Sequence, residues 1–308
     1  MKKSKVLQQL DICKIREAIL DKKMEREHYN LNEGHVGEAE NYQRFKQFGS
    51  EYWRYDLNYW FNHGKRMEVD MLVIAENQWL VIEVKNYKGL FEYKDNECFI
   101  NGRLMSDNQV TKMNHRVNRI RHMAAEVSSE IEVIGAMVFI NEHSDVKLES
   151  GNEFDIVMRN QLQRYIRKFR ENNHFAMYDQ TLNRVYQVLE RHRDQTPFVP
   201  KSLSLEVFEQ LRKGITCKSC DSFDVQMSYK YVECKGCWTN ELKSEAILRT
   251  AYQLRYLYYD HPEMVTRRNV YEFCGGMVSE RTINRTLAKN YEKIGATNNL
   301  YYEIQLPQ

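Results

Sequence analysis

The sequence predicts an α/β protein in which a mixed sheet with flanking helices is followed by two small modules. Three observations support this prediction. Helical and strand-like segments alternate over the first 195 residues, four of the seven cysteines form two close pairs, and the first two prolines lie together in DQTPFVPKS. Because proline interrupts helices and sheet ladders, this segment is the expected linker. We therefore divide the chain into residues 1–31, 32–195, 196–203, 204–241 and 242–308.

The first part contains the elements of a layered α/β domain. A polar helical stretch covers residues 4–28, and a second helix is expected from Gly37. Its apolar residues recur at helical spacing: Ala39, Tyr42, Phe45 and Phe48. Strand-like runs follow at Glu68–Ala75, Trp79–Lys85, Glu132–Ile140 and Phe154–Met158. Further helices are expected at residues 108–127, 159–171 and 180–193.

Composition restricts the class of protein. The chain has 45 Lys and Arg against 43 Asp and Glu, a net charge of +2, so a nucleic-acid surface would require local clusters of charge. No apolar run approaches the ~20 residues that a membrane helix needs. Charges interrupt the N-terminus before a signal-peptide core can form. We expect a cytoplasmic protein without a membrane partner, and the sequence does not predict its oligomeric state.

The most informative segment is EVDMLVIAENQWLVIEVKNYKG, in which two apolar strands flank a short polar turn. A turn centred on residues 76–77 places Asp70 directly opposite Glu83, where cross-strand Cβ atoms are about 5 Å apart. Glu83 and Lys85 share one strand face. Two carboxylates and an amine are therefore expected to converge at the end of otherwise apolar strands.

Carboxylates this close repel one another unless a cation separates them. Mg²⁺ (or Mn²⁺) bound by Asp70 and Glu83 would resolve the conflict and keep waters, one of which can attack a phosphodiester. Lys85 would orient or deprotonate that water, or neutralise charge on the phosphate. The alternative is a solvent-facing Glu83–Lys85 ion pair worth about 0–1 kcal/mol.

The spacing D-x₁₂-E-x-K on a hairpin resembles the PD-(D/E)xK nuclease superfamily. Three segments more closely resemble its nuclease-related domain (NERD) family: Gly34-x-x-Gly37-Glu38, Glu68-x-Asp70 before an apolar strand, and I-E-V-K-N-Y-x-G from residue 82. The resemblance covers roughly residues 32–150 and implies a restriction-endonuclease-like mixed sheet.

The resemblance also implies two further catalytic residues. Glu38 matches the family's acidic residue on a helix, and the alternative is a charge that favours a helix N-terminus. Gln109 matches a glutamine at the start of the next helix, although Met105-Ser106 stand where the family has Asn-Pro. An ordinary polar residue at a helix start is the alternative for Gln109.

The helix after Gln109 is amphipathic. Its apolar stripe consists of Val110, Met113, Val117, Ile120 and Ala124. Basic residues occupy the other side: Lys112, His115, Arg116, Arg119 and His122. Lys112, Arg116 and Arg119 are candidates for contacts with a DNA backbone, and a solvated basic face is the alternative.

Four cysteines form a C-x₂-C-x₁₃-C-x₂-C pattern: Cys217, Cys220, Cys234 and Cys237. Four thiolates satisfy tetrahedral zinc and leave no open position, so we expect a structural zinc site that resembles a zinc ribbon, with a strand at residues 225–232. A redox C-x-x-C motif is disfavoured, because two matched pairs occur and neither opens a βαβ unit.

The C-terminal segment reads as a helix to about residue 260, then helix, Gly-Gly turn, helix and a strand–turn–strand ending. This order resembles a winged helix-turn-helix. Ile283, Leu287 and Tyr291 form an inward stripe. Candidate DNA contacts lie on the outer side: Arg281, Asn284, Arg285 and Lys289. The alternatives are a helical cap and a protein-binding module.

Together these features predict a nuclease that needs a divalent metal and acts on DNA, with accessory DNA-binding modules. The alternative is a non-catalytic DNA-binding regulator built on a nuclease-like scaffold, since fold does not fix function. RNA as the substrate stays open, because the chemistry is the same.

Overall fold

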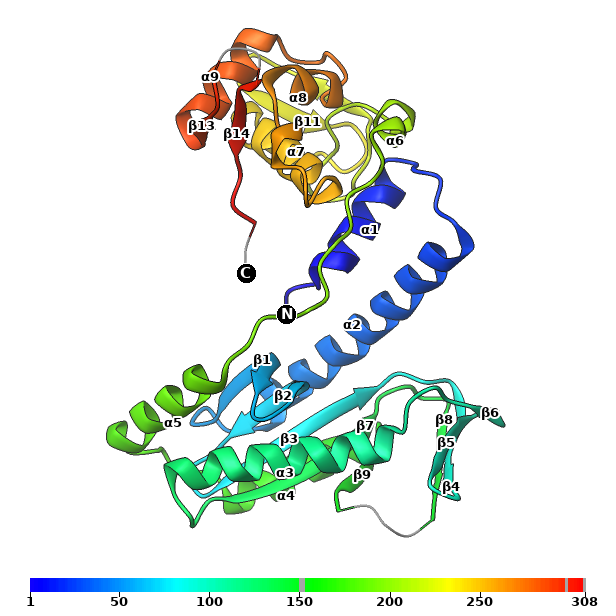
Figure 1. The fold of residues 1–308 in the computed structure, drawn as a ribbon, viewed down its shortest axis with the longest axis vertical. Coiled ribbons are helices and arrows are strands. Elements are labelled where there is room, and N and C mark those ends of the chain that lie inside the picture. The colour runs from blue at the N-terminus through cyan, green and yellow to red at the C-terminus, as the bar shows by residue number, and fades with distance from the viewer. Residues whose placement is uncertain (150–152, 297–298, 307–308) are drawn as a thin grey trace. The chain divides into compact units, whose positions relative to one another are not determined.

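The computed structural model describes residues 1–149, 153–296 and 299–306. The chain divides into two compact units (Figure 1). One unit comprises residues 30–196, and the other comprises residues 2–29 together with residues 197–308. No helix in the described part of the chain is both long and apolar enough to cross a membrane.

A five-stranded mixed sheet forms the centre of the unit at residues 30–196. Its strands are β1 (Arg54–Asn62), β2 (Arg66–Ile74), β3 (Gln78–Lys85), β7 (Glu132–Phe139) and β9 (Asp155–Met158), in the order β1-β2-β3-β7-β9. The first three strands are antiparallel, and β3, β7 and β9 run parallel. The predicted α/β class with a mixed sheet is therefore confirmed.

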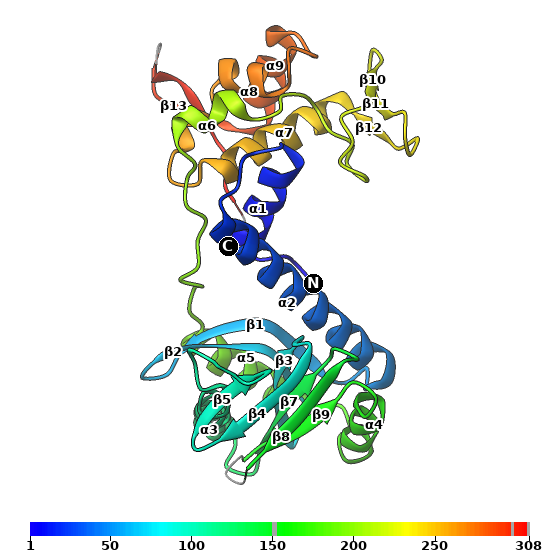
Figure 2. The ribbon, with the colours of Figure 1, turned by 90° about the vertical axis from the view of Figure 1, so that its right-hand side faces the viewer.

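A second sheet of four strands was not predicted. It contains β4 (Gly89–Lys94), β5 (Glu97–Ile100), β6 (Arg103–Leu104) and β8 (Ser144–Leu148), in the order β6-β5-β4-β8 (Figure 2). These strands are short and carry few buried residues, so their sequence lacks the apolar runs that identify the central strands.

Helices cover both faces of the central sheet. On one face, α3 (Gln109–Val127) and α5 (Asp179–His192) enclose the larger core, which includes the predicted apolar stripe of α3. On the other face, α4 (Leu162–Asn172) and the second half of α2 (Lys22–Phe48) pack against alternate residues of the same strands. The approach of α3 is close, because a Cβ on Gly135 of β7 would lie 2.5 Å from Val117 Cγ2.

The helix boundaries near the N-terminus differ from the prediction. Residues 4–28 are not one helix: α1 (Lys5–Ile15) ends before a turn, and α2 begins at Lys22. The predicted helix start at Gly37 is wrong, because α2 continues through that residue. Gly37 instead permits close packing, since a Cβ there would lie 2.9 Å from Ile140 Cγ2 and 3.1 Å from Asn86 Cβ.

The other unit has its own core, in which α1 packs against α7 (Lys243–Leu257). Its remaining elements are α6 (Leu205–Gln210), the sheet β10 (Val225–Met227), β11 (Tyr231–Cys234) and β12 (Asn240–Leu242), the 3₁₀ helix η1 (Pro262–Met264), α8 (Arg267–Phe273), α9 (Glu280–Asn290), and the pair β13 (Glu292–Ile294) and β14 (Tyr301–Glu303). The sequence analysis set residues 1–31 apart, whereas the structure places α1 in this core.

Arg16, just after α1, joins the N-terminal segment to this unit. Its fully buried guanidinium donates hydrogen bonds to the backbone oxygens of Arg212 and Gly214, at 3.1 and 2.9 Å, and to Gln253 Oε1 at 2.7 Å. Burial lowers the pKa of Arg16 to about 9. The N-terminal segment is thus bound to residues that lie about 200 positions further along the chain.

Candidate active site and metal centre

The β2–β3 hairpin brings the predicted acid pair together at one end of the sheet. Its ladder ends at the pair Met71 and Ile82, so Asp70 and Glu83 occupy the next opposed positions. Asp70 Oδ2 accepts a hydrogen bond from the Val84 N–H at 2.7 Å, which fixes the carboxylate at the strand end. Strand alternation directs Asp70 and Glu83 to the sheet face that α3 covers.

Glu83 and Lys85 form a buried ion pair. Lys85 Nζ lies 2.6 Å from Glu83 Oε1, and the two residues are only 8% and 4% exposed. Arg116, from α3, places Nη1 3.5 Å from Glu83 Oε2 and donates a hydrogen bond from Nε to the Glu68 backbone oxygen. The pair is therefore not the solvent-facing ion pair considered as the alternative.

Two more acids lie near the pair. Glu38 on α2 accepts a hydrogen bond from Asn58 Nδ2 at 3.2 Å, and Glu68 is two residues before Asp70 on β2. Burial raises the pKa of Glu38 to about 7, and the charges of Glu68 and Glu83 add to this shift. Burial and the charges of Asp70 and Glu83 likewise raise the pKa of Glu68 to about 7.

The pKa values of Asp70 and Glu83, at the strand ends, are shifted in opposite directions. Burial and the charges of Glu83 and Glu38 raise the pKa of Asp70 well above its ordinary value. Burial also opposes the ionisation of Glu83, but Lys85 and Arg116 outweigh it and lower the pKa of that carboxyl. Burial would lower the pKa of Lys85, yet Glu83 raises it, so the amine stays charged. Environments that separate neighbouring acids in this way are typical of functional sites.

Acidic side chains outnumber basic ones around this site, which we call the acidic centre. Glu38, Glu68, Asp70 and Glu83 face Lys85 and Arg116, so four ionised acids would leave two negative charges unbalanced. Glu83 Oε2 is buried and accepts no hydrogen bond from the described residues, since Arg116 Nη1 reaches it only at the ion-pair distance of 3.5 Å. A divalent cation would satisfy both the orphaned oxygen and the excess charge, and carboxylate oxygens are the ligands that Mg²⁺ prefers. The residues present therefore fit the predicted metal.

The remaining candidate site residues on α3 have different surroundings in the structure. Gln109 is the first residue of the helix, which Asn108 caps. Lys112 pairs with Asp107 at 2.8 Å on the surface, and its charge also lowers the pKa of Glu83. Arg119 lies against the turn at Gly64, within 3.6 Å of where a Cβ on that glycine would stand. Arg116 is only 15% exposed and points to Glu83, so it does not belong to a solvated basic face.

Two residues at the centre were not among the predicted site residues. Glu68 could have been found from the segment Glu68-x-Asp70, in which Asp70 was already a candidate. Asn58, which donates to Glu38, has a positive φ of 50° on β1, and no sequence pattern marks it.

The four paired cysteines converge in the other unit. Cys217 Sγ lies 3.5 Å from Cys237 Sγ, and Cys220 Sγ lies 3.6 Å from Cys234 Sγ, with all four sulfurs within 4.8 Å of one another. The strand predicted at residues 225–232 is in fact a hairpin of β10 and β11 with a turn at residues 228–230. The clustered thiols fit the donor set of a tetrahedral zinc site.

The C-terminal segment contains the expected helices and a final strand pair. Ile283 and Leu287 of α9 are fully buried, whereas the basic residues of the outer side, Arg281, Arg285 and Lys289, are exposed. Asn284 accepts a hydrogen bond from the Tyr302 hydroxyl at 2.6 Å, which ties α9 to β14. Asn284 therefore has a structural partner within the unit.

Three comparisons with known proteins bear on these observations. Residues 33–140 match the family model described as the nuclease-related domain. A solved structure, the small subunit of the heterodimeric restriction endonuclease R.BspD6I, is 14% identical, with a TM-score of 0.25, over 60% of this chain and 86% of that chain. The comparison with curated proteins gave no match. The matched residues include the acids and lysine at the strand ends.

Proposed function

Because residues 33–140 form a nuclease-related domain, we propose that this chain is a divalent-metal-dependent nuclease that hydrolyses phosphodiester bonds in DNA. The observation that carries the proposal is the group formed by the half-buried Asp70 and the buried pair Glu83 and Lys85 at the end of the β2–β3 hairpin. An acid pair at this depth costs free energy unless a cation balances it. The site therefore favours a function that requires that cation.

Asp70 and Glu83 are the proposed ligands of Mg²⁺ or Mn²⁺. When bound, the metal would activate a water and stabilise charge on the phosphoryl oxygens. Asp70 holds its position through the Val84 N–H, and Glu83 through Lys85 and Arg116. Arg116, which the sequence analysis assigned to DNA, is here assigned to the positioning of Glu83.

Lys85 and Glu38 have separate proposed roles. Lys85 stays protonated beside Glu83, so it would neutralise charge on the phosphate rather than act as a base. Glu38, with a pKa of about 7, exchanges protons at neutral pH, which suits an assisting acid or base. Gln109, at the start of α3, is proposed to contact the phosphate.

The accessory parts are proposed to hold the substrate. The four clustered cysteines would bind a structural Zn²⁺. Basic residues would contact the DNA backbone: the partly exposed Lys112 and Arg119 in the nuclease-related domain, and the exposed Arg281, Arg285 and Lys289 on α9. We propose that the module containing α9 is winged-helix-like. Asn284, bonded to Tyr302, could reach DNA only by giving up that bond.

A cleavage assay tests the catalytic proposal. Purified protein is incubated with plasmid, linear DNA and RNA in Mg²⁺ or Mn²⁺, beside Glu83→Gln, Lys85→Met and the exposed control Glu51→Gln. We expect cleavage by the wild type and the control, and a loss of at least 100-fold in the two site variants, because removal of a group that acts in the transition state costs on this order. RNA cleavage alone would replace DNA as the substrate.

The same assay examines the alternative, a non-catalytic DNA-binding regulator. Cleavage that is absent throughout, or equal in all proteins, contradicts the nuclease proposal. If a gel-shift experiment then shows salt-dependent binding of DNA, the regulator becomes the better assignment. The presence of all the expected acids and the lysine favours the enzyme.

A further inference from the structure

We call residues 30–196 the nuclease-related unit. A second group of metal-ligating side chains lies in this unit, apart from the site described above. His63 is in the turn between β1 and β2, Glu126 is in the last turn of α3, and His192 is the last residue of α5. One ligand atom from each lies within 4.8 Å of the others. The three residues are far apart in the sequence, so only the fold brings them together.

We propose that His63, Glu126 and His192 bind a first-row transition-metal ion such as Zn²⁺. Bonds of about 2.0–2.2 Å from zinc to nitrogen or oxygen, at the tetrahedral angle, place ligand atoms about 3.3–3.6 Å apart. His63 Nε2 lies 3.9 Å from Glu126 Oε1, which is close to this separation and too long for a hydrogen bond. His192 Nε2 lies 2.7 Å from the same oxygen, where a metal would replace the shared proton.

The distance of His63 from Glu126 supports an ion over a self-contained hydrogen-bonded cluster. His63 Nε2 is too far from Glu126 to donate or accept a hydrogen bond, so a metal ion would be the group that joins the two side chains. The His122 ring lies parallel to the His63 ring, 6.0 Å away, and helps to fix its orientation.

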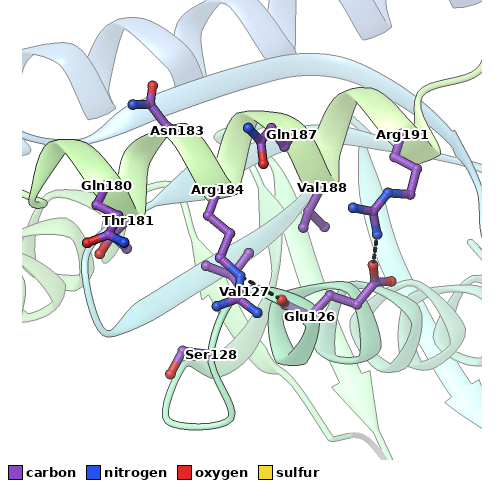
Figure 3. A pocket seen from close by; sticks show the side chains of 10 residues that line it. All are labelled: Glu126, Val127, Ser128, Gln180, Thr181, Asn183, Arg184, Gln187, Val188 and Arg191. Carbon is purple, nitrogen blue, oxygen red and sulfur yellow. Dashed lines mark hydrogen bonds and ion pairs between the residues drawn. The ribbon is translucent and has the colours of Figure 1, made fainter.

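The surroundings orient Glu126 as a ligand. Arg191 binds Glu126 Oε2 at 2.8 Å, and Arg184 donates to the Glu126 backbone oxygen at 3.1 Å; Figure 3 shows both arginines extending from α5 to α3. Oε1 is thereby left to face the two histidines. Outer partners that fix a ligating carboxylate in this way are typical of metal sites. Glu126 also lines the pocket between α3 and α5.

The donor set selects the kind of metal. Two imidazoles and one carboxylate suit Zn²⁺, Cu²⁺ or Ni²⁺, whereas Mg²⁺ prefers oxygen ligands and retains its waters. Three protein ligands leave a fourth position for water. The ion would fasten the β1–β2 turn to the C-terminal ends of α3 and α5, and it is separate from the acidic centre and the four cysteines.

Native mass spectrometry of the full chain tests the proposal. The protein is equilibrated with chelator-buffered Zn²⁺ in excess Mg²⁺, so that magnesium occupies the acidic centre. We expect the wild type to carry one more zinc than His63→Gln and His192→Asn, and the same number as His143→Asn. His143 is the matched control, because it is an exposed histidine 3.5 Å from a single glutamate, Glu142.

A titration with competing chelator gives the affinity. Zinc should bind the second site at least ten-fold more weakly in each cluster variant, and Cys217→Ser should lose a different zinc independently. Zn²⁺ should also raise the melting temperature of the wild type above its value in Mg²⁺ alone, and His192→Asn should lose the part of this increase that does not come from the four cysteines. Equal zinc counts and affinities in the wild type and the cluster variants would overturn the proposal.

Discussion

Replacement of Glu68 by Gln tests the electrostatic account of the acidic centre. Burial and the neighbouring charges of Asp70 and Glu83 raise the pKa of Glu68 to about 7, whereas a glutamate in an unfolded chain has a pKa of about 4.3. Between these values the folded protein retains a proton that the unfolded chain has lost. The free energy of unfolding therefore falls as the pH rises from about 4.5 to 7.

The magnitude follows from the two pKa values. A difference of about 2.7 units at 1.36 kcal/mol per unit gives up to about 3.7 kcal/mol, of which about 2.5 kcal/mol is lost between pH 5 and pH 8. Glu68→Gln has no proton to lose, so its stability should depend less on pH by about that amount. Bound Mg²⁺ should also reduce the loss, because it balances the acids when they ionise.

Urea unfolding at pH 5, 6, 7 and 8 without added divalent metal provides the measurement. Tryptophan fluorescence in a Trp238→Phe background reports the nuclease-related unit, because the other tryptophans lie within residues 30–196. Glu51→Gln, at an exposed position, should retain the wild-type pH dependence. If Glu68→Gln and the wild type lose stability equally from pH 5 to pH 8, the assigned pKa shift is wrong.

Three further predictions concern packing and DNA binding. Gly37→Ala should destabilise the nuclease-related unit by about 1–3 kcal/mol in urea unfolding, because the new Cβ would overlap Ile140. Gly34→Ala should be neutral or stabilising, because the nearest atom to its new Cβ is 3.9 Å away, and equal effects of the two substitutions would refute the packing argument. Arg16→Met should cost the other unit about 3–5 kcal/mol, because a buried network loses its donor, and an unchanged urea midpoint would contradict this. Reversing the charges of Arg281 and Arg285 together should reduce the magnitude of the slope of log affinity for DNA against log salt by about 2, measured by fluorescence anisotropy. An unchanged slope would exclude α9 from the DNA contact.

The hairpin at the acidic centre was predictable because residues close together in the sequence determine it. Two apolar strands with a two-residue turn determine the register, and the register alone places Asp70 opposite Glu83. The cysteine cluster was predictable for the same reason, since each pair is close in sequence. Short separations leave the chain few other ways to arrange these residues.

The role of Arg116 could not be predicted from helical periodicity. Its position opposite the apolar stripe indicated a solvated side, but α3 lies against the strand ends, and that side meets Glu83 there. The prediction that a helix begins at Gly37 was wrong for a related reason. Gly37 resembles a helix boundary locally, and only the positions of Ile140 and Asn86 show that it permits close packing.

The packing of α1 into the core of the second unit has a consequence for biosynthesis. Residues 2–29 emerge from the ribosome before residues 30–196, yet their partners, residues 197–308, emerge after them. The nuclease-related unit can fold while the early helix still lacks its binding surface. Expression of residues 197–308 alone would leave an apolar groove without its native occupant, so a truncated form of that unit should retain residues 2–29, joined by a short linker.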